Sequence, residues 1–69
     1  MNTKELTHRQ LAVINALENE HLTSFQILNK INNISLILVV YTVLDELKNM
    51  GILKSYFKKD MQYHYINVE

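Results

Sequence analysis

Glycine and proline are the residues that most often interrupt regular structure, and this 69-residue chain has a single glycine, Gly51, and no proline. The segment that ends at this glycine, Ser35 to Gly51, reads SLILVVYTVLDELKNMG. Serine at its start can cap a helix by accepting a hydrogen bond from a free backbone N–H group. Glycine beyond a last turn can adopt the left-handed conformation that closes a helix. The segment therefore predicts a helix over 35–50.

Apolar residues repeat along this segment at helical spacing, which predicts one buried face and one exposed face. The stripe expected in the core consists of Ile37, Val40, Leu44 and Leu47, widened on one side by Leu36, Val43 and Met50. The side expected to face solvent carries Ser35, Leu38, Thr42, Asp45, Glu46 and Asn49. The function of this second face is the main question that the sequence raises.

Two shorter helices are expected before residue 35. Thr7-His8-Arg9-Gln10 and Thr23-Ser24-Phe25-Gln26 each match the capping box that starts a helix. The first helix has an apolar stripe formed by Leu11, Ile14 and Leu17. The second covers about 24–31, with Ile27, Leu28 and Ile31 as buried candidates, and Asn32-Asn33 ends it. Leu22 is expected to pack against the second helix or to form a one-residue strand contact.

After Gly51 the sequence becomes rich in strand-forming residues. Residues 52–57 and 62–68 predict a β-hairpin, with Lys58-Lys59-Asp60-Met61 at its tip. If Phe57 pairs with Gln62, alternation along the strands divides the side chains between two faces. The face expected to pack on the helices holds Leu53, Ser55, Phe57, Gln62, His64 and Ile66. The face expected outside holds Ile52, Lys54, Tyr56, Tyr63, Tyr65 and Asn67.

Three helices followed by a hairpin is the order of a winged helix, a mainly α fold with a small β-hairpin (α+β). We expect one domain over 1–69, with 35–50 as the recognition helix and 52–68 as the wing. The competing arrangement, a three-helix bundle with a disordered tail, fits poorly because disordered tails rarely carry so many Tyr, Phe, Ile and Val residues.

The composition argues against several classes of function. The chain has no cysteine, and its three histidines lack the spacing of metal ligands, so we expect no disulfide, metal or cofactor. His8, His21 and His64 are expected to be ordinary surface or half-buried residues. No nucleophile, base and acid stand at a meaningful spacing, and no small-molecule ligand is evident, so an enzyme is not expected. The apolar run 34–40 is too short to span a bilayer, and no signal peptide is visible, which favours a cytoplasmic location without membrane contact.

Part of the chain resembles a known family. Residues 40–53, VYTVLDELKNMGIL, resemble the recognition helix and wing entry of ferric-uptake-regulator-like proteins, whose pattern there is V-Y-R-T-L-x-x-L-x-x-x-G-L-I. Residues 22–28, LTSFQIL, are similar to that family's L-T-A-x-x-I-Y helix start, and a leucine-rich helix that ends in this way is typical of many bacterial winged-helix regulators. The resemblance covers about 22–57. It implies a winged-helix DNA-binding fold in which Tyr41 matches a DNA-facing position.

Two departures from that family limit what the resemblance implies. Thr42 stands where the family has arginine, and 69 residues leave no room for its metal-binding dimerisation domain, so iron sensing is not implied. The sequence thus predicts a small regulator, a homodimer, that binds double-stranded DNA. Its expected contacts are Ser35, Leu38, Val39, Tyr41 and Thr42 on the helix and Lys54, Lys58 and Lys59 on the wing.

The formal net charge of zero and the absence of arginine from the recognition helix weigh against DNA binding. The alternative is therefore a winged-helix module that binds another protein and has little or no affinity for DNA.

Overall fold

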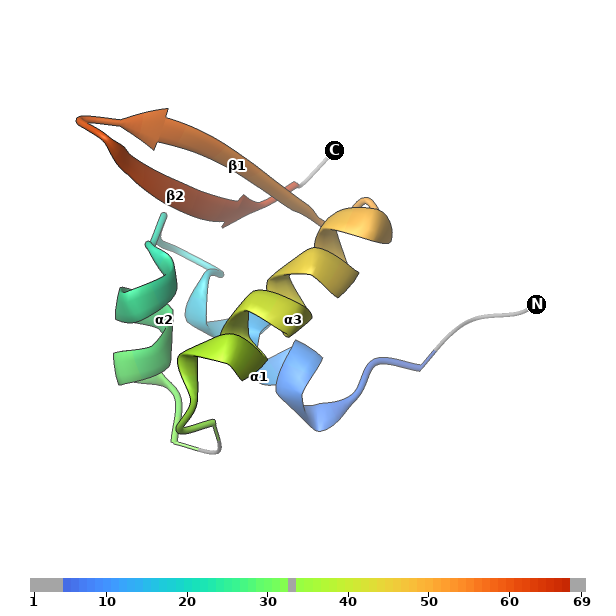
Figure 1. Ribbon diagram of the computed structural model, residues 1–69. Coiled ribbons are helices and arrows are strands. Elements are labelled where there is room, and N and C mark those ends of the chain that lie inside the picture. Colours follow the sequence, from blue (N-terminus) through green and yellow to red (C-terminus); the bar gives the residue numbers. More distant parts are fainter. Residues whose placement is uncertain (1–4, 33, 68–69) are drawn as a thin grey trace.

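The computed structural model describes residues 5–32 and 34–67. Over these residues three helices precede a two-stranded antiparallel hairpin (Figure 1). In chain order the elements are α1 (His8–Ala16), α2 (Ser24–Lys30), α3 (Ile37–Asn49), β1 (Leu53–Lys58) and β2 (Met61–Ile66). This α+β arrangement has the winged-helix order that the sequence predicts.

Both predicted capping boxes are present. At the start of α1, the Thr7 side chain accepts a hydrogen bond from the Gln10 backbone N–H at 3.1 Å, and the Gln10 side chain accepts one from the Thr7 N–H at 2.9 Å. Thr23 and Gln26 make the same reciprocal pair at the start of α2. Each box satisfies two backbone donors that the first turn leaves free.

The predicted start of α3 is wrong, although its end is confirmed. Leu36, in extended conformation, occupies the N-cap, and it makes no side-chain capping bond, so Ser35 caps nothing. Ile34 is buried just before it, which anchors the turn and leaves Ser35 exposed in extended chain. At the other end, Gly51 has φ +80°, and the N–H groups of Gly51 and Ile52 donate to the carbonyls of Lys48 and Leu47. These two bonds form the Schellman motif.

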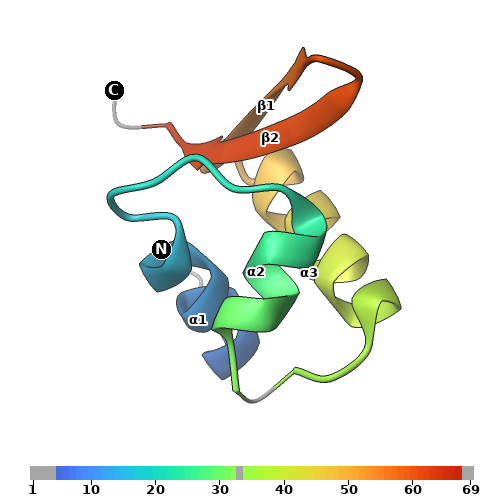
Figure 2. The same ribbon diagram turned by 90° about the vertical axis from the view of Figure 1, so that its left-hand side faces the viewer.

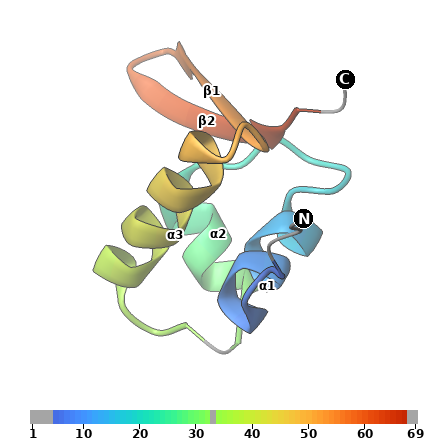
Figure 3. The same ribbon diagram turned by 90° about the vertical axis from the view of Figure 1, so that its right-hand side faces the viewer.

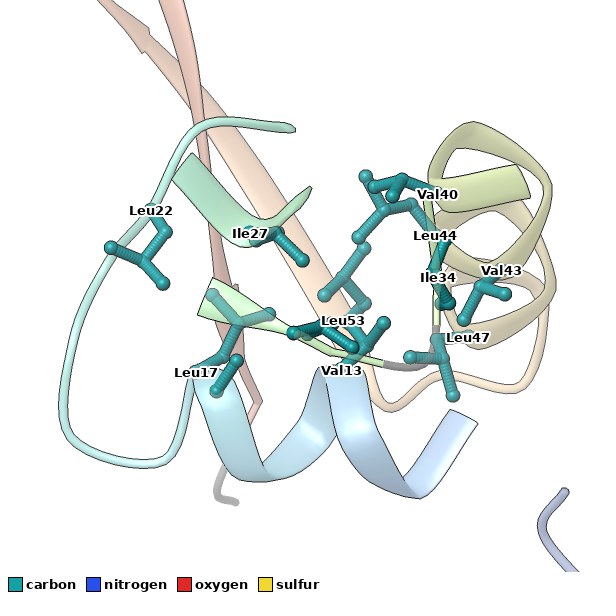
Figure 4. Close-up of a cluster of buried hydrophobic side chains, with 12 residues drawn as sticks. Val13, Leu17, Leu22, Ile27, Ile34, Val40, Val43, Leu44, Leu47 and Leu53 are labelled. Carbon is teal, nitrogen blue, oxygen red and sulfur yellow. The ribbon is translucent and has the colours of Figure 1, made fainter. Parts of the chain in front are cut away.

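The core lies where the three helices and the base of the hairpin meet (Figure 4). From α3 it receives Val40, Val43, Leu44 and Leu47, as the helical wheel predicts, whereas Ile37 of the predicted stripe is only partly buried. Leu36 and Met50, which were expected to widen this stripe, are 65% and 38% exposed, because they lie at the helix boundaries, beyond the packed turns.

The predicted stripe of α1 is also only partly correct. Leu11 is exposed and Ile14 is partly buried, whereas Val13 and Leu17 are buried. The buried face is rotated so that Gln10 faces α3, where its Nε2 donates to the Glu46 carboxylate at 2.9 Å. The predicted burial of Ile27 and Ile31 is confirmed, whereas Leu28 is only partly buried.

The hairpin has the predicted register, with Phe57 opposite Gln62. Its turn is tighter than expected, since Lys58 and Met61 still pair and only Lys59 and Asp60, both with positive φ, form the loop. Two central residues with positive φ match the turn that suits the twist of a hairpin. Residue 68 of the predicted second strand lies outside the described part of the chain.

The base of the hairpin rests on the helices and its tip extends past them. Leu22 forms an isolated bridge with His64, which confirms the predicted one-residue strand contact. Figures 2 and 3 show the tip projecting on the side of α3 rather than of α1. Phe57, on the inward face, is consequently 72% exposed rather than packed on the helices. Among the described residues, no helix has the length and apolar character needed to cross a membrane.

Candidate nucleic-acid interface

The exposed face of α3 is apolar and hydroxyl-bearing in its first half. Leu38 is 71% exposed and Tyr41 is 45% exposed, with Thr42 exposed beside them and Ser35 exposed just before the helix. The Thr42 hydroxyl donates to the Leu38 carbonyl at 3.0 Å, so its proton is used within the helix. Its oxygen still has a free lone pair and can accept a hydrogen bond from a ligand.

Val39 lies on the α1 side of α3, partly buried against the core, and is less accessible than the sequence suggests. It lines a depression of about 360 Å3 that also contains Arg9 and Thr42. No pattern in the sequence associates Arg9 with the recognition helix, because this arginine lies at the start of α1. Its placement beside Thr42 depends on how α1 packs against α3, which no local motif reports.

Tyr41 lies on the other flank of α3, toward α2 and the hairpin. There it lines a cleft of about 170 Å3 together with Asp45, Lys48 and Gln62. Lys48 and Arg9 therefore place one cation on each side of the exposed face, although α3 itself contains no arginine. Asp45 and Glu46 lie one turn beyond Tyr41 and Thr42 and bring two negative charges to the second half of the face, with Glu46 lining the same depression as Arg9.

His64 holds the hairpin against α2. Its Nδ1 lies 2.7 Å from the Ser55 hydroxyl oxygen, and its Nε2 lies 3.2 Å from that of Ser24. Its backbone exchanges two hydrogen bonds with Leu22. The residue is 5% exposed, so its description as an ordinary surface or half-buried histidine is wrong. Burial, and secondarily the charge of Lys48, lower the pKa of His64 below its ordinary value of 6.5.

The structure divides the predicted contact residues between two surfaces. Leu53 and His64 point toward the helices, and alternation along the strands turns Lys54 and Lys58 to the opposite face of the hairpin. Lys59 lies in the turn at the tip. The residues of α3 thus form one surface, and Lys54 and Lys58 belong to another.

Within residues 5–32 and 34–67, no group of three His, Cys, Asp or Glu residues is arranged to hold a metal ion. Comparison with known protein families and with curated protein sequences gave no match.

Proposed function

We propose that this chain is a small winged-helix transcriptional regulator that binds double-stranded DNA. The first half of α3 enters the major groove, and the hairpin tip reaches the neighbouring backbone. The observation that carries this proposal is the unobstructed face of α3 around Leu38 and Thr42. In Figures 2 and 3 the first turns of α3 and the hairpin tip lie on the same side of the molecule. The resemblance of 22–57 to ferric-uptake-regulator-like proteins supports the same function.

The chemistry of this face suits base edges better than phosphates. Leu38 offers an apolar contact for a thymine methyl group, and the free lone pair of Thr42 can accept from a base amino group. Backbone contacts come from Arg9 of α1 and Lys48 in the last turn of α3, one on each side of the face, and from Lys59 at the hairpin tip. Asp45 limits the depth of insertion, since its carboxylate would be repelled by phosphates.

Few cations surround this face, so a single copy binds weakly, and we propose that two copies bind two half-sites as a homodimer. The exposed apolar side chains Phe25, Leu36 and Met61 supply surface for such an association. A cytoplasmic location and the absence of catalytic activity belong to the same proposal.

A matched pair of leucine substitutions tests the role of α3. Leu38→Glu places a negative charge where the groove is expected, and Leu11→Glu makes the same change on an exposed leucine of α1. We expect Leu38→Glu to weaken binding of duplex DNA by about tenfold or more, because a lost base contact is replaced by repulsion. Leu11→Glu should leave binding near the wild-type value. Fluorescence anisotropy with a labelled duplex at low salt measures both.

The salt dependence of binding supplies a second criterion. With about three phosphate contacts per copy, log K should fall with log salt at a slope of about −3 for one copy and about twice that for a dimer.

Equal losses for the two leucine variants would contradict the proposed docking surface. Absence of any binding at micromolar protein would instead favour the alternative function.

That alternative, a protein-interaction module, is favoured by one observation. Phe25, Leu36 and Phe57 are each at least 60% exposed, while the net charge of the chain is zero. Sedimentation of the protein without DNA distinguishes self-association from binding to a different partner.

A further inference from the structure

The outer face of the hairpin, turned away from the helices, combines aromatic rings with cations. Three cross-strand pairs make up this face: Lys54 with Tyr65, Tyr56 with Tyr63, and Lys58 with Met61. Three of the four tyrosines of the chain therefore lie on one surface, and Tyr41 on α3 is the fourth. We call the surface formed by these six residues and His21 the tyrosine face.

The rings of the tyrosine face touch one another in sequence. His21 stacks on Tyr65 with centroids 4.8 Å apart, and Tyr56 stacks on Tyr63 at 5.7 Å. Tyr56 also contacts Tyr65 at 5.8 Å, which links the two stacked pairs, and its hydroxyl lies 2.8 Å from His21 Nδ1. Among the described aromatic residues, Tyr63 has Tyr56 as its single neighbour. It therefore ends the stack on the side of the hairpin tip, where a further ring can add.

Charge is distributed unevenly across the face. Lys54 and Lys58 both belong to β1, whose other edge pairs with no strand among the described residues. The rings of β2 occupy the middle, and His21 lies at the opposite edge. Beyond His21, Glu18 and Glu20 line an open pocket of about 610 Å3. Glu20 is paired with Lys30, so Glu18 is the carboxylate of this pocket that is left to repel an anion. An anionic chain on this face is consequently drawn toward the lysines of β1 and away from the edge at Glu18.

We propose that the tyrosine face binds single-stranded DNA, with an unpaired base stacked on Tyr63 at the end of the stack and phosphates held by Lys54 and Lys58. Two lysines four residues apart on a strand are about 13 Å apart, so they contact different phosphates. Stacking on aromatic rings combined with a basic track is how proteins bind single strands without reading their sequence.

The arrangement favours an unpaired strand over other anionic partners. In a duplex the base faces are already stacked and hidden, so the rings would have nothing to contact. An acidic peptide would form ion pairs with the lysines but would make no stacking contact with the tyrosines. The choice of DNA rather than RNA rests on the proposed function, whereas the face itself shares no residue with the exposed surface of α3.

The first test compares two oligonucleotides that differ only in their bases. A labelled oligothymidylate and an abasic strand of equal length are titrated with the protein at low salt, and anisotropy is recorded. Stacking adds about tenfold or more in affinity for each base engaged, so the abasic strand should bind at least about tenfold more weakly. Because the chain has no tryptophan, binding should also quench most of its intrinsic fluorescence, which arises mainly from the tyrosine face.

The second test uses the fourth tyrosine as a control. Tyr63→Leu combined with Tyr65→Leu keeps the hairpin apolar but removes two rings, and Tyr41→Leu makes the same change on α3. We expect the double variant to lose at least about tenfold in oligothymidylate affinity and to keep its affinity for duplex DNA. Tyr41→Leu should do the reverse. Lys54→Ala should weaken both the normal and the abasic strand, because it removes a phosphate contact. Circular dichroism establishes that each variant is folded.

Several results would overturn the inference. Equal affinity for the abasic strand, or for polyglutamate, would show a nonspecific contact with anions. Binding of oligouridylate without oligothymidylate would exclude DNA as the ligand. If duplex binding fails while the oligothymidylate results hold, the proposed function is wrong and the tyrosine face stands.

Discussion

At the scale of single residues, His64 connects more of this fold than any motif suggests. Its backbone pairs with Leu22, while its two ring nitrogens meet the hydroxyls of Ser55 and Ser24. A neutral imidazole donates from one nitrogen and accepts at the other, and hydroxyl groups can play either part, so both contacts are satisfied. The alternating pattern correctly placed His64 on the inward face. Its burial depends on the approach of α2, which the pattern does not contain.

The lowered pKa of His64 makes stability depend on pH. Burial and Lys48 disfavour the charged ring, so between the folded pKa and 6.5 the unfolded chain binds more protons than the folded one. The contribution of neutral His64 to the free energy of unfolding should therefore be complete above pH 6.5 and decrease as the pH drops below that value. Urea unfolding at about pH 7.5 and about pH 5.5 measures the difference. In His64→Gln this difference should shrink, and an unchanged difference would assign the effect to other groups.

At the scale of elements, capping residues predicted a helix boundary correctly wherever no tertiary contact competes with the cap. The boxes at Thr7 and Thr23 satisfy their own first turns, and Gly51 needs only its own positive φ to end α3. Ser35 failed as a signal because burial of the neighbouring Ile34 competes with capping, and burial prevails. The start of α3 was thus set by tertiary packing, and could not be read from the residues around it.

The uncapped start of α3 leads to a stability prediction. Leu36 is the N-cap, is 65% exposed and makes no side-chain bond there. Leu36→Ser should raise the free energy of unfolding by about 1 kcal/mol, because its oxygen can accept from a free N–H group. Leu38→Ser, inside the helix and equally exposed to solvent, should lower it by a few tenths of a kcal/mol (~0.5) through helix propensity alone. Thermal unfolding of both variants checks the prediction, and shifts of the same sign would contradict it.

At the scale of the whole molecule, the order of the elements and the register of the hairpin could be predicted from the sequence. How far the hairpin extends past the helices could not. The three helices and the pairing of Phe57 with Gln62 follow from patterns that extend over whole segments. How far the hairpin extends past the helices depends on the lengths of separate elements and on where they meet. For that reason Phe57 was expected in the core, and Lys54 was grouped with α3 although it faces away.

The small core makes the whole fold sensitive to one substitution. Leu47 is fully buried where α3 meets the other elements, and Leu47→Ala removes contacts worth about 2–5 kcal/mol. A domain of this size seldom has more than about 3–5 kcal/mol in total. We expect the variant to be largely unfolded at 25 °C by circular dichroism, whereas Leu11→Ala, at an exposed position, should remain folded. A folded Leu47→Ala variant would show that other parts of the fold supply more stability than its core does.

The bridge between Leu22 and His64 fixes the hairpin at its base, and within the described ranges no hydrogen bond joins the turn at Lys59 and Asp60 to the helices. A hairpin held by hydrogen bonds at its base alone transmits a force applied at its tip to that base. A pull on Lys59 or Met61 is carried along β2 to His64, and from there to Ser24 and the first turn of α2. Binding of a partner at the tip is therefore expected to affect the contact between His64 and α2, and a change at that contact is expected to affect the tip.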